Sequence, residues 1–366
     1  MKYWLIGLMI VSFITAGIIF GGCGQATSTT TTLAWQVIGA ANFSSGEAWS
    51  TSLYVYNGTP YIAYTDLGNN HKATVMKYTG SQWECVGLPG FSAGSAESTS
   101  LSIYNGTPYI AYLDEGNNHQ VTVKKYNGIS WEAVGLDVDL PGGGAELRLF
   151  ISNGNIYIGY KDRRCAYKAT VKKYDGSSWN TIGSDGFSAN EPFYSSLFVY
   201  NETPYLAYAD GNGGKATVMK YNGSTWEAVG TPGFSENGIY RPSLYVSNNI
   251  PYVAFSPTVI GTVEVRKYNG ASWESVGELG AGGVTSLCLY NGDPYIAYEI
   301  NGGLTLRKYN GTTWEAIGEP GFSQLASTSA LDPKLFIENS IPYLAFNDGY
   351  SYVGQSAKVS VMKYGE

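Results

Sequence analysis

The sequence is poor in charged residues and has only two histidines. Of its 366 residues 14% are charged, and the formal net charge is −7. No run of lysine or arginine offsets this negative charge, so the basic patch that nucleic acid requires is missing. The sequence therefore predicts no nucleic-acid partner.

Cysteine is scarce as well. Cys23 belongs to the N-terminal segment, and Cys85, Cys165 and Cys288 fall at unrelated positions of the repeats described below. Such a set makes neither a disulfide framework nor a metal site. We expect Cys85 and Cys288 to be small buried residues and Cys165 to be a loop thiol, and we expect no cofactor.

The N-terminal segment has the pattern of an export signal. Lys2 precedes an almost wholly apolar stretch over residues 3–20, and Gly21 and Gly22 then precede Cys23. This junction resembles a prokaryotic lipoprotein signal, which implies a signal peptide at 1–22 and lipidation of Cys23. An uncleaved anchor and simple secretion are the alternatives. All three place the protein outside the cytoplasm, and the first two predict membrane tethering at the cell surface or in the periplasm, with residues 23–33 as a polar tether.

Glycine (47) and tyrosine (31) are abundant, and the rest of the chain is periodic. A W-x-x-V/I-G segment recurs every 47 or 48 residues in most repeats, and each copy accompanies a "PYIAY"-like and a "KY"-ending segment. Asn-Gly pairs at 57–58, 105–106, 127–128, 222–223, 269–270 and 310–311 predict type I′ hairpin turns. Each repeat thus contains four strands, with apolar strands inside and more polar strands outside.

These units predict an all-β fold, a seven-bladed β-propeller of four-stranded antiparallel blades over 34–366. The last repeat ends where its Trp strand should begin, and the missing strand is "AWQVIG" at 34–39. The N-terminal strand therefore completes the C-terminal blade and removes an open sheet edge. We expect the closed ring to be a monomer.

The segments "YNGSTW" (221–226) and "YNGTTW" (309–314) resemble the Asp-box, although Tyr221 and Tyr309 occupy the place of its Asp. The chain is similar to the kelch- and Asp-box-like propellers of exported prokaryotic proteins. That resemblance implies the fold, while these motifs are structural and say little about chemistry.

Two repeated features occupy the face that carries the longer loops, opposite the Asn-Gly turns. An aspartate follows the "PYIAY" strand in five repeats, and these residues are Asp66, Asp114, Asp162, Asp210 and Asp348. The five carboxylates could bind cations or sugar hydroxyls, or each could cap its own loop, and a feature copied in most blades favours capping. The phenylalanine of "GFS" or "NFS" is expected to pack between loops or blades. His71 and His119 end two segments that faintly resemble calcium loops, for which turn structure is again favoured.

Residues that break the repeat are the better candidates for specificity. They are Trp49, Arg163, Arg164, Tyr167, Tyr240, Arg241, Tyr350 and Tyr352. Aromatic and arginine side chains on one rim suit a glycan or protein ligand, and drift of unrelated loops is the alternative. The sequence favours a tethered binding module for a protein or polysaccharide, without a recognisable catalytic set. The alternatives are an Asp-box-type glycan-active enzyme or lectin, similar to sialidases, and a docking platform in an envelope complex.

Overall fold

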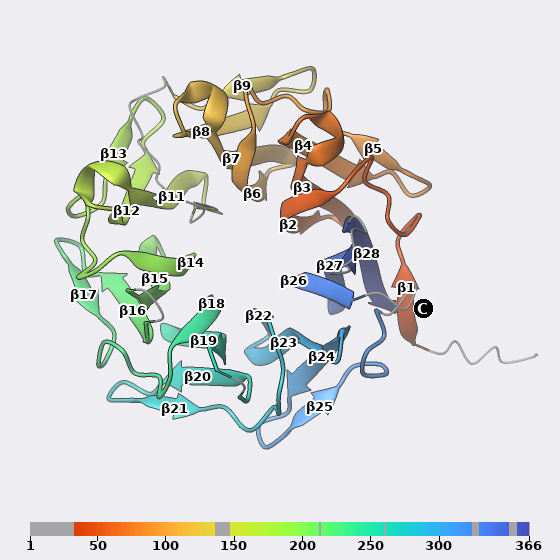
Figure 1. Cartoon of the computed structure of the whole chain (residues 1–366). Coiled ribbons are helices and arrows are strands. Elements are labelled where there is room, and N and C mark those ends of the chain that lie inside the picture. Colours follow the sequence, from red (N-terminus) through yellow and green to blue (C-terminus); the bar gives the residue numbers. More distant parts are fainter. Residues whose placement is uncertain are drawn as a thin grey trace, which may run out of the picture. The chain divides into compact units, whose positions relative to one another are not determined.

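The computed structural model describes residues 33–135, 147–211, 214–259, 261–323, 329–350 and 357–365. Residues 33–366 form one compact unit, in which seven four-stranded antiparallel sheets form a ring (Figure 1). The predicted all-β, seven-bladed fold is confirmed. The predicted signal peptide, Cys23 and most of the tether lie outside the described residues. No helix within the described ranges is long and apolar enough to cross a membrane.

Each blade has its first strand nearest the axis of the ring and its fourth strand at the rim (Figure 1). The first strands are β2 (Ala48–Tyr56), β6 (Ala96–Tyr104), β10 (Arg148–Ser152), β14 (Pro192–Tyr200), β18 (Ile239–Ser247), β22 (Thr285–Tyr290) and β26 (Ser329–Glu338). The second strands are β3 (Thr59–Asp66), β7 (Thr107–Asp114), β11 (Asn155–Asp162), β15 (Thr203–Asp210), β19 (Ile250–Pro257), β23 (Asp293–Ile300) and β27 (Ile341–Tyr350).

The outer half of each blade is shorter. The third strands are β4 (Lys72–Tyr78), β8 (Gln120–Tyr126), β12 (Lys168–Tyr174), β16 (Ala216–Tyr221), β20 (Glu264–Tyr268), β24 (Gly303–Tyr309) and β28 (Lys358–Gly365). The fourth strands are β5 (Trp83–Cys85), β9 (Trp131–Ala133), β13 (Trp179–Thr181), β17 (Trp226–Ala228), β21 (Trp273–Ser275), β25 (Trp314–Ala316) and β1 (Ala34–Val37).

The ring closes through the N-terminal strand, as the sequence predicts. Strand β1 pairs antiparallel with β28, and Trp35 lies opposite Tyr364. The seventh sheet therefore has the order β1-β28-β27-β26, which joins the two ends of the described chain in one blade (Figure 1).

Tryptophan joins the blades at the rim. In every blade the indole Nε1 donates to a backbone carbonyl that follows the outer strand of the preceding blade. The pairs are Trp35–Ile317, Trp83–Ile38, Trp131–Val86, Trp179–Val134, Trp226–Ile182, Trp273–Val229 and Trp314–Val276, at 2.6–3.1 Å. We call this set the tryptophan ring. Trp35 joins the closing blade to the sixth blade, and Trp83 joins the first blade to the closing one. The tryptophan ring therefore continues across the point where the propeller closes.

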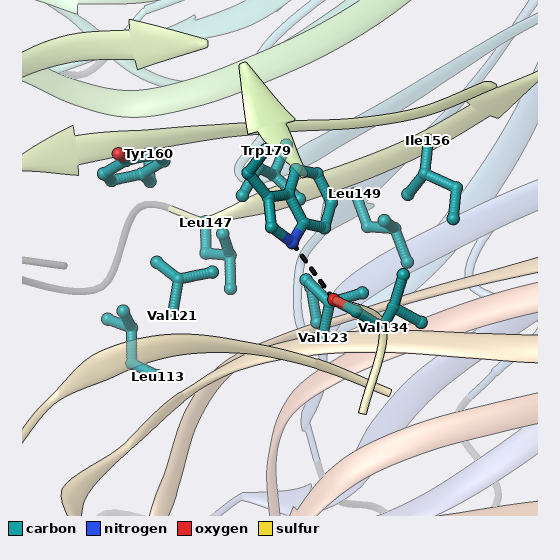
Figure 2. Packing of buried hydrophobic residues seen from close by; sticks show 11 residues of the cluster. Leu113, Val121, Val123, Val134, Leu147, Leu149, Ile156, Tyr160 and Trp179 are labelled. Atoms are coloured by element: carbon teal, nitrogen blue, oxygen red, sulfur yellow. Dashed lines mark hydrogen bonds between the residues drawn. The ribbon is translucent and has the colours of Figure 1, made fainter. Parts of the chain in front are cut away.

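The core lies between neighbouring blades. Figure 2 shows one such cluster, in which Trp179 packs against Leu149 and Ile156 of its own blade and against Val123 and Val134 of the preceding one. The "GFS" phenylalanines belong to the same interfaces, as expected. They stack on indoles with ring centroids 4.0–4.6 Å apart in the pairs Phe43–Trp83, Phe91–Trp131, Phe187–Trp226, Phe234–Trp273 and Phe322–Trp35.

The Asn-Gly turns are of two kinds, which corrects one expectation. Asn57 and Gly58 both have positive φ (49° and 74°), as a type I′ turn requires. At 127–128, 222–223, 269–270 and 310–311 only the glycine has positive φ. In these turns the asparagine side chain instead accepts backbone N–H groups, as Asn127 Oδ1 does from Ile129 and Ser130. This local bond, an Asx turn, replaces the type I′ geometry.

The three cysteines within the described ranges, Cys85, Cys165 and Cys288, are free thiols. The expected burial of Cys85 is wrong, because its side chain is exposed at the end of the three-residue rim strand β5. Cys288, on the axial strand β22, is half-buried, and burial raises the pKa of its thiol to about 12.

Candidate functional site

The first strands converge on a cavity of about 380 Å³ at the axis of the ring. All seven blades contribute to its lining, with Ser50, Ser98, Arg148, Tyr194, Arg241, Val284 and Asp332 each representing one blade. These residues lie near the N-terminal ends of the first strands, where the longer loops enter. The cavity, which we call the axial cavity, therefore opens on the loop-rich face that the sequence indicates.

A bulge in the first strand shapes the wall of this cavity. The register of the strand shifts in five blades, for example between Trp49 and Ser52 and between Tyr240 and Ser243. At each bulge a residue other than glycine adopts positive φ, and these residues are Ser50, Ser98, Tyr194, Arg241 and Asp332. A bulge re-aims side chains, and here all five of the positive-φ residues line the cavity.

Two residues past this position, most blades place a serine that bonds to the next blade. The hydroxyl accepts the backbone N–H of a leucine at 2.9–3.1 Å in the pairs Ser52–Leu101, Ser100–Leu149, Ser196–Leu244, Ser243–Leu287 and Ser286–Leu335. We call these five residues the serine ring. Arg148 and Lys334 occupy the same position in the other two blades, and their cationic side chains cannot accept such a bond.

Three cations and one carboxylate share the cavity wall. Asp332 Oδ1 accepts from Arg241 Nη1 at 2.7 Å and from Lys334 Nζ at 2.6 Å. Arg148 Nη1 donates to the carbonyl of Leu147 at 2.7 Å, and within the described ranges no carboxylate lies within ion-pair distance of its guanidinium. We call Arg148, Arg241 and Lys334 the cation cluster. Its three positive charges exceed the single negative charge of Asp332.

The electrostatics of the group are tightly coupled. Burial alone would raise the pKa of the Asp332 carboxyl, but the charges of Lys334, Arg241 and Arg148 hold that pKa below its usual value. Burial, reinforced by Arg241 and Arg148, lowers the pKa of Lys334 although Asp332 opposes the change. The Arg148 charge thus acts on both Asp332 and Lys334, an ion pair of another blade. Arg148 therefore belongs to the same cluster of charges.

Unpaired hydroxyls complete the polar wall. Thr51 and Thr285 line the cavity and are 3% and 6% exposed, and among the described residues their Oγ1 atoms have no hydrogen-bond partner. A buried hydroxyl without a partner is costly, so these atoms are available to a ligand or to water. Farther along the first strands the axis is aromatic, with ring contacts of 4.5–4.9 Å in the pairs Tyr54–Phe336, Phe150–Phe198 and Phe198–Tyr245.

The predicted aspartates lie beneath this face. Asp66, Asp114, Asp162 and Asp348 are at most 2% exposed, and Asp210 is half-buried. Asp66 accepts from Ser45, Asn69 and Thr74, and Asp114 accepts from backbone N–H groups of its own and a neighbouring loop. Asp162 pairs with Arg164, and Asp210 accepts from Asn190. These contacts are those of the loop-capping alternative.

The two loops that end in histidine, and the equivalent loop of the third blade, are turns in the structure. "DLGNNH", "DEGNNH" and "DRRCAY" each form a 3-10 turn, at η1 (Leu67–Asn69), η2 (Glu115–Asn117) and η3 (Arg163–Cys165), with two positive-φ residues after it. His71 and His119 are the second of these two residues in their loops. In the described ranges no group of three His, Cys, Asp or Glu side chains could hold a metal ion.

The predicted rim residues divide into two groups. Trp49, Tyr167 and Tyr240 are 51%, 43% and 43% exposed, and Trp49 and Tyr240 directly precede the cavity-lining residues Ser50 and Arg241. Arg163 is not among the cavity-lining residues, and its Nη2 donates to the carbonyl of Asn118 at 3.4 Å. The side chains of Tyr350 and Tyr352 lie outside the described residues.

Sequence reasoning missed Arg148, Asp332, Lys334 and the serine ring. The signal was present in the aligned repeats, because Arg148 in "LRLFI" and Lys334 in "PKLFI" stand where "TSLYV", "TSLSI", "SSLFV", "PSLYV" and "TSLCL" have serine. Read singly, each residue is an ordinary charged residue in a strand. Only superposition of the repeats about one axis brings the two into one cavity.

No family model and no curated protein matches the chain. Solved structures do match it. A protein of unknown function from Dyadobacter fermentans is 12% identical, with a TM-score of 0.54 over 91% of this chain and 98% of that one. An ulvan lyase, a polysaccharide lyase bound to a saccharide of glucuronic acid and 3-sulfated rhamnose, is 13% identical, with a TM-score of 0.55 over 87% and 94%. The Aleuria aurantia lectin, in complex with a fucosyl saccharide, is 14% identical, with a TM-score of 0.51 over 78% and 99%. At these identities the likeness shows the fold.

Proposed function

We propose that this chain is an exported, membrane-tethered binding propeller that holds a glycan at the axial cavity of its loop-rich face. The observation that carries the proposal is the composition of that cavity, in which hydroxyls and cations from seven blades surround one opening. Saccharides are recognised by such hydrogen-bonding groups in combination with aromatic faces. The lipoprotein-like segment ending at Cys23 supports export and tethering.

Two exposed aromatic residues next to cavity-lining residues in the sequence offer stacking surfaces of the kind that a sugar ring needs. Trp49 and Tyr240 are about half exposed and each adjoins a residue of the cavity wall. Tyr240 also meets Tyr194 edge to face, with the ring centroids 5.5 Å apart. Among the structural neighbours, the lectin and the ulvan lyase both bind saccharides, which is consistent with a glycan ligand.

The test is a glycan and polysaccharide array probed with residues 24–366. Trp49→Ala and Tyr240→Ala should each weaken binding of whichever glycan the parent retains, because each removes a stacking surface. Ile129→Ala is the matched control, since Ile129 is 86% exposed on a turn of the opposite face. Absence of any retained glycan would refute the proposal. Release of reducing sugar from a bound polysaccharide would instead establish the alternative, a glycan-active enzyme.

A further inference from the structure

We infer, on the basis of the proposed function, that the axial cavity binds an acidic polysaccharide, with its carboxylate or sulfate groups held by Arg148, Arg241 and Lys334. Three cations face one carboxylate in this cavity, although the chain as a whole has a net charge of −7. Positive charge is thus concentrated at the axis of an acidic protein.

The positions of Arg148 and Lys334 argue against a structural role for their charges. In the other five blades this position carries a serine that bonds to the next blade. Serine is therefore the residue that joins the blades at this position. An arginine or lysine there forgoes that bond and brings like charges together in a partly enclosed space, where Asp332 balances only one of the three charges. The remaining positive charge is unfavourable without a counter-charge. A bound anion supplies the missing counter-charge.

The donors needed for an anion remain available. Arg241 and Lys334 each give one N–H to Asp332 Oδ1, and Arg148 gives one to the Leu147 carbonyl. A guanidinium has five N–H groups and an ammonium has three, so most of these donors have no partner among the described residues. The Arg241 and Lys334 side chains are 48% and 33% exposed, which leaves them accessible from the opening. Asp332 is a positioning residue, because it holds two of the cations side by side.

The ligand needs polar groups besides its charge. The unpartnered hydroxyls of Thr51 and Thr285 lie in the same wall as the cations, and Tyr194 also lines the cavity. Such neighbours suit the hydroxyls of a sugar ring beside its acidic group. An acidic polysaccharide combines these features.

The experiment measures binding of polygalacturonate, dextran sulfate and uncharged dextran to residues 24–366 at low and high salt. The first two probes separate carboxylate from sulfate as the recognised group. Arg148→Ser and Lys334→Ser install the residue of the other blades, and each should weaken binding of the preferred acidic probe about tenfold or more. Arg148→Lys keeps the charge but loses the paired N–H donors of the guanidinium. Its affinity for the acidic probe should lie between those of the parent and of Arg148→Ser.

The control is Lys215→Ser, which removes an exposed cation from a loop of the same face outside the cavity lining. It should leave binding unchanged, and thermal unfolding should show that every variant is folded. The inference is overturned if the parent binds neither acidic probe, if Arg148→Ser and Lys334→Ser bind like the parent, or if Lys215→Ser weakens binding equally. If the array retains only neutral glycans, this inference fails while the proposed function stands.

Discussion

The rim and the axis of the ring join the same blades in different ways. At the rim all seven blades use a tryptophan indole that donates to a neighbouring carbonyl. At the axis five blades use a serine hydroxyl and two have Arg148 and Lys334 in its place. A position filled identically in every blade serves the fold. A position where the repeat is broken inside a cavity is where a ligand site can be added to the fold without disturbing the rest.

The largest disturbance of the rim is removal of the closing strand. Deletion of residues 34–38 takes away β1, the Trp35–Ile317 bond and the stack of Trp35 on Phe322, and leaves β28 as an open edge. We expect a loss of at least ~3–5 kcal/mol in unfolding free energy, with aggregation, as for loss of a buried tryptophan. Denaturant unfolding and size-exclusion chromatography measure both effects.

Deletion of residues 24–28, five positions of the predicted tether, is the control of equal length. It should unfold like the parent. If the deletion of 34–38 also unfolds like the parent, the closure does not stabilise the ring, and the uniformity of the rim loses its structural explanation.

A single tryptophan tests the rim more narrowly. Trp179 is 7% exposed and donates to Val134 O at 3.1 Å (Figure 2), so Trp179→Ala should lower the unfolding free energy by about 3–5 kcal/mol. Trp49 is 51% exposed, and Trp49→Ala should stay within ~0.5 kcal/mol of the parent. Equal losses in the two variants by urea unfolding would contradict the distinction between repeated and repeat-breaking tryptophans.

Most of the fold could be predicted because the repeat specifies it locally. The number of Trp segments predicts the number of blades, and the lone strand at 34–39 predicts how the ring closes. The turn at 127–128 could not be predicted from its Asn-Gly pair, because the Asn127 side chain competes with the type I′ geometry by bonding to backbone N–H groups.

The candidate site was predictable only in part. Trp49, Tyr240 and Arg241 interrupt the repeat in loops or at strand starts, so composition alone marks them. Arg148 and Lys334 are 186 positions apart in the sequence and keep the local pattern of a strand, so only the closed ring brings them together. Capping aspartates such as Asp66 stood out in sequence because they repeat, and the same repetition indicates their structural role.

At the axis, the serine that joins two blades and the arginine that replaces it can be compared directly by substitution. Ser100→Ala removes the bond from Leu149 N at 2.9 Å and should cost about 0.5–1.5 kcal/mol of unfolding free energy. Arg148→Ser, at the equivalent position of the next blade, should leave stability unchanged or raise it, because it relieves like charges and can restore the inter-blade bond. Parallel urea titrations compare the two. A loss for Arg148→Ser larger than that for Ser100→Ala would show that Arg148 is part of the structural framework.

The smallest effect is expected at a third set of inter-blade contacts, near the loop-side end of the second strand. Thr65, Lys161 and Asn347 each bond to the next blade, to Ala96 O, Glu191 and Ala48 O. Glu299 is the corresponding residue of the sixth blade, and burial alone, with no charged or hydrogen-bonding neighbour among the described residues, shifts the pKa of its carboxyl. Burial raises the pKa of this carboxyl above its ordinary value, so the folded state favours the protonated form more than the unfolded chain does.

The sign of the pH dependence follows from that shift. A carboxyl whose pKa is raised on folding contributes stability that is present below its unfolded pKa and is lost as the pH rises through its folded pKa. Glu299→Gln mimics the protonated form. Its melting temperature should therefore be slightly above that of the parent at pH 7 and equal to it at pH 4. Glu236→Gln, at an exposed loop position, should match the parent at both pH values. A Glu299→Gln variant that melts below the parent at pH 7 would mean that the ionised carboxylate has a stabilising partner, and that the sixth blade keeps the contact of the other three.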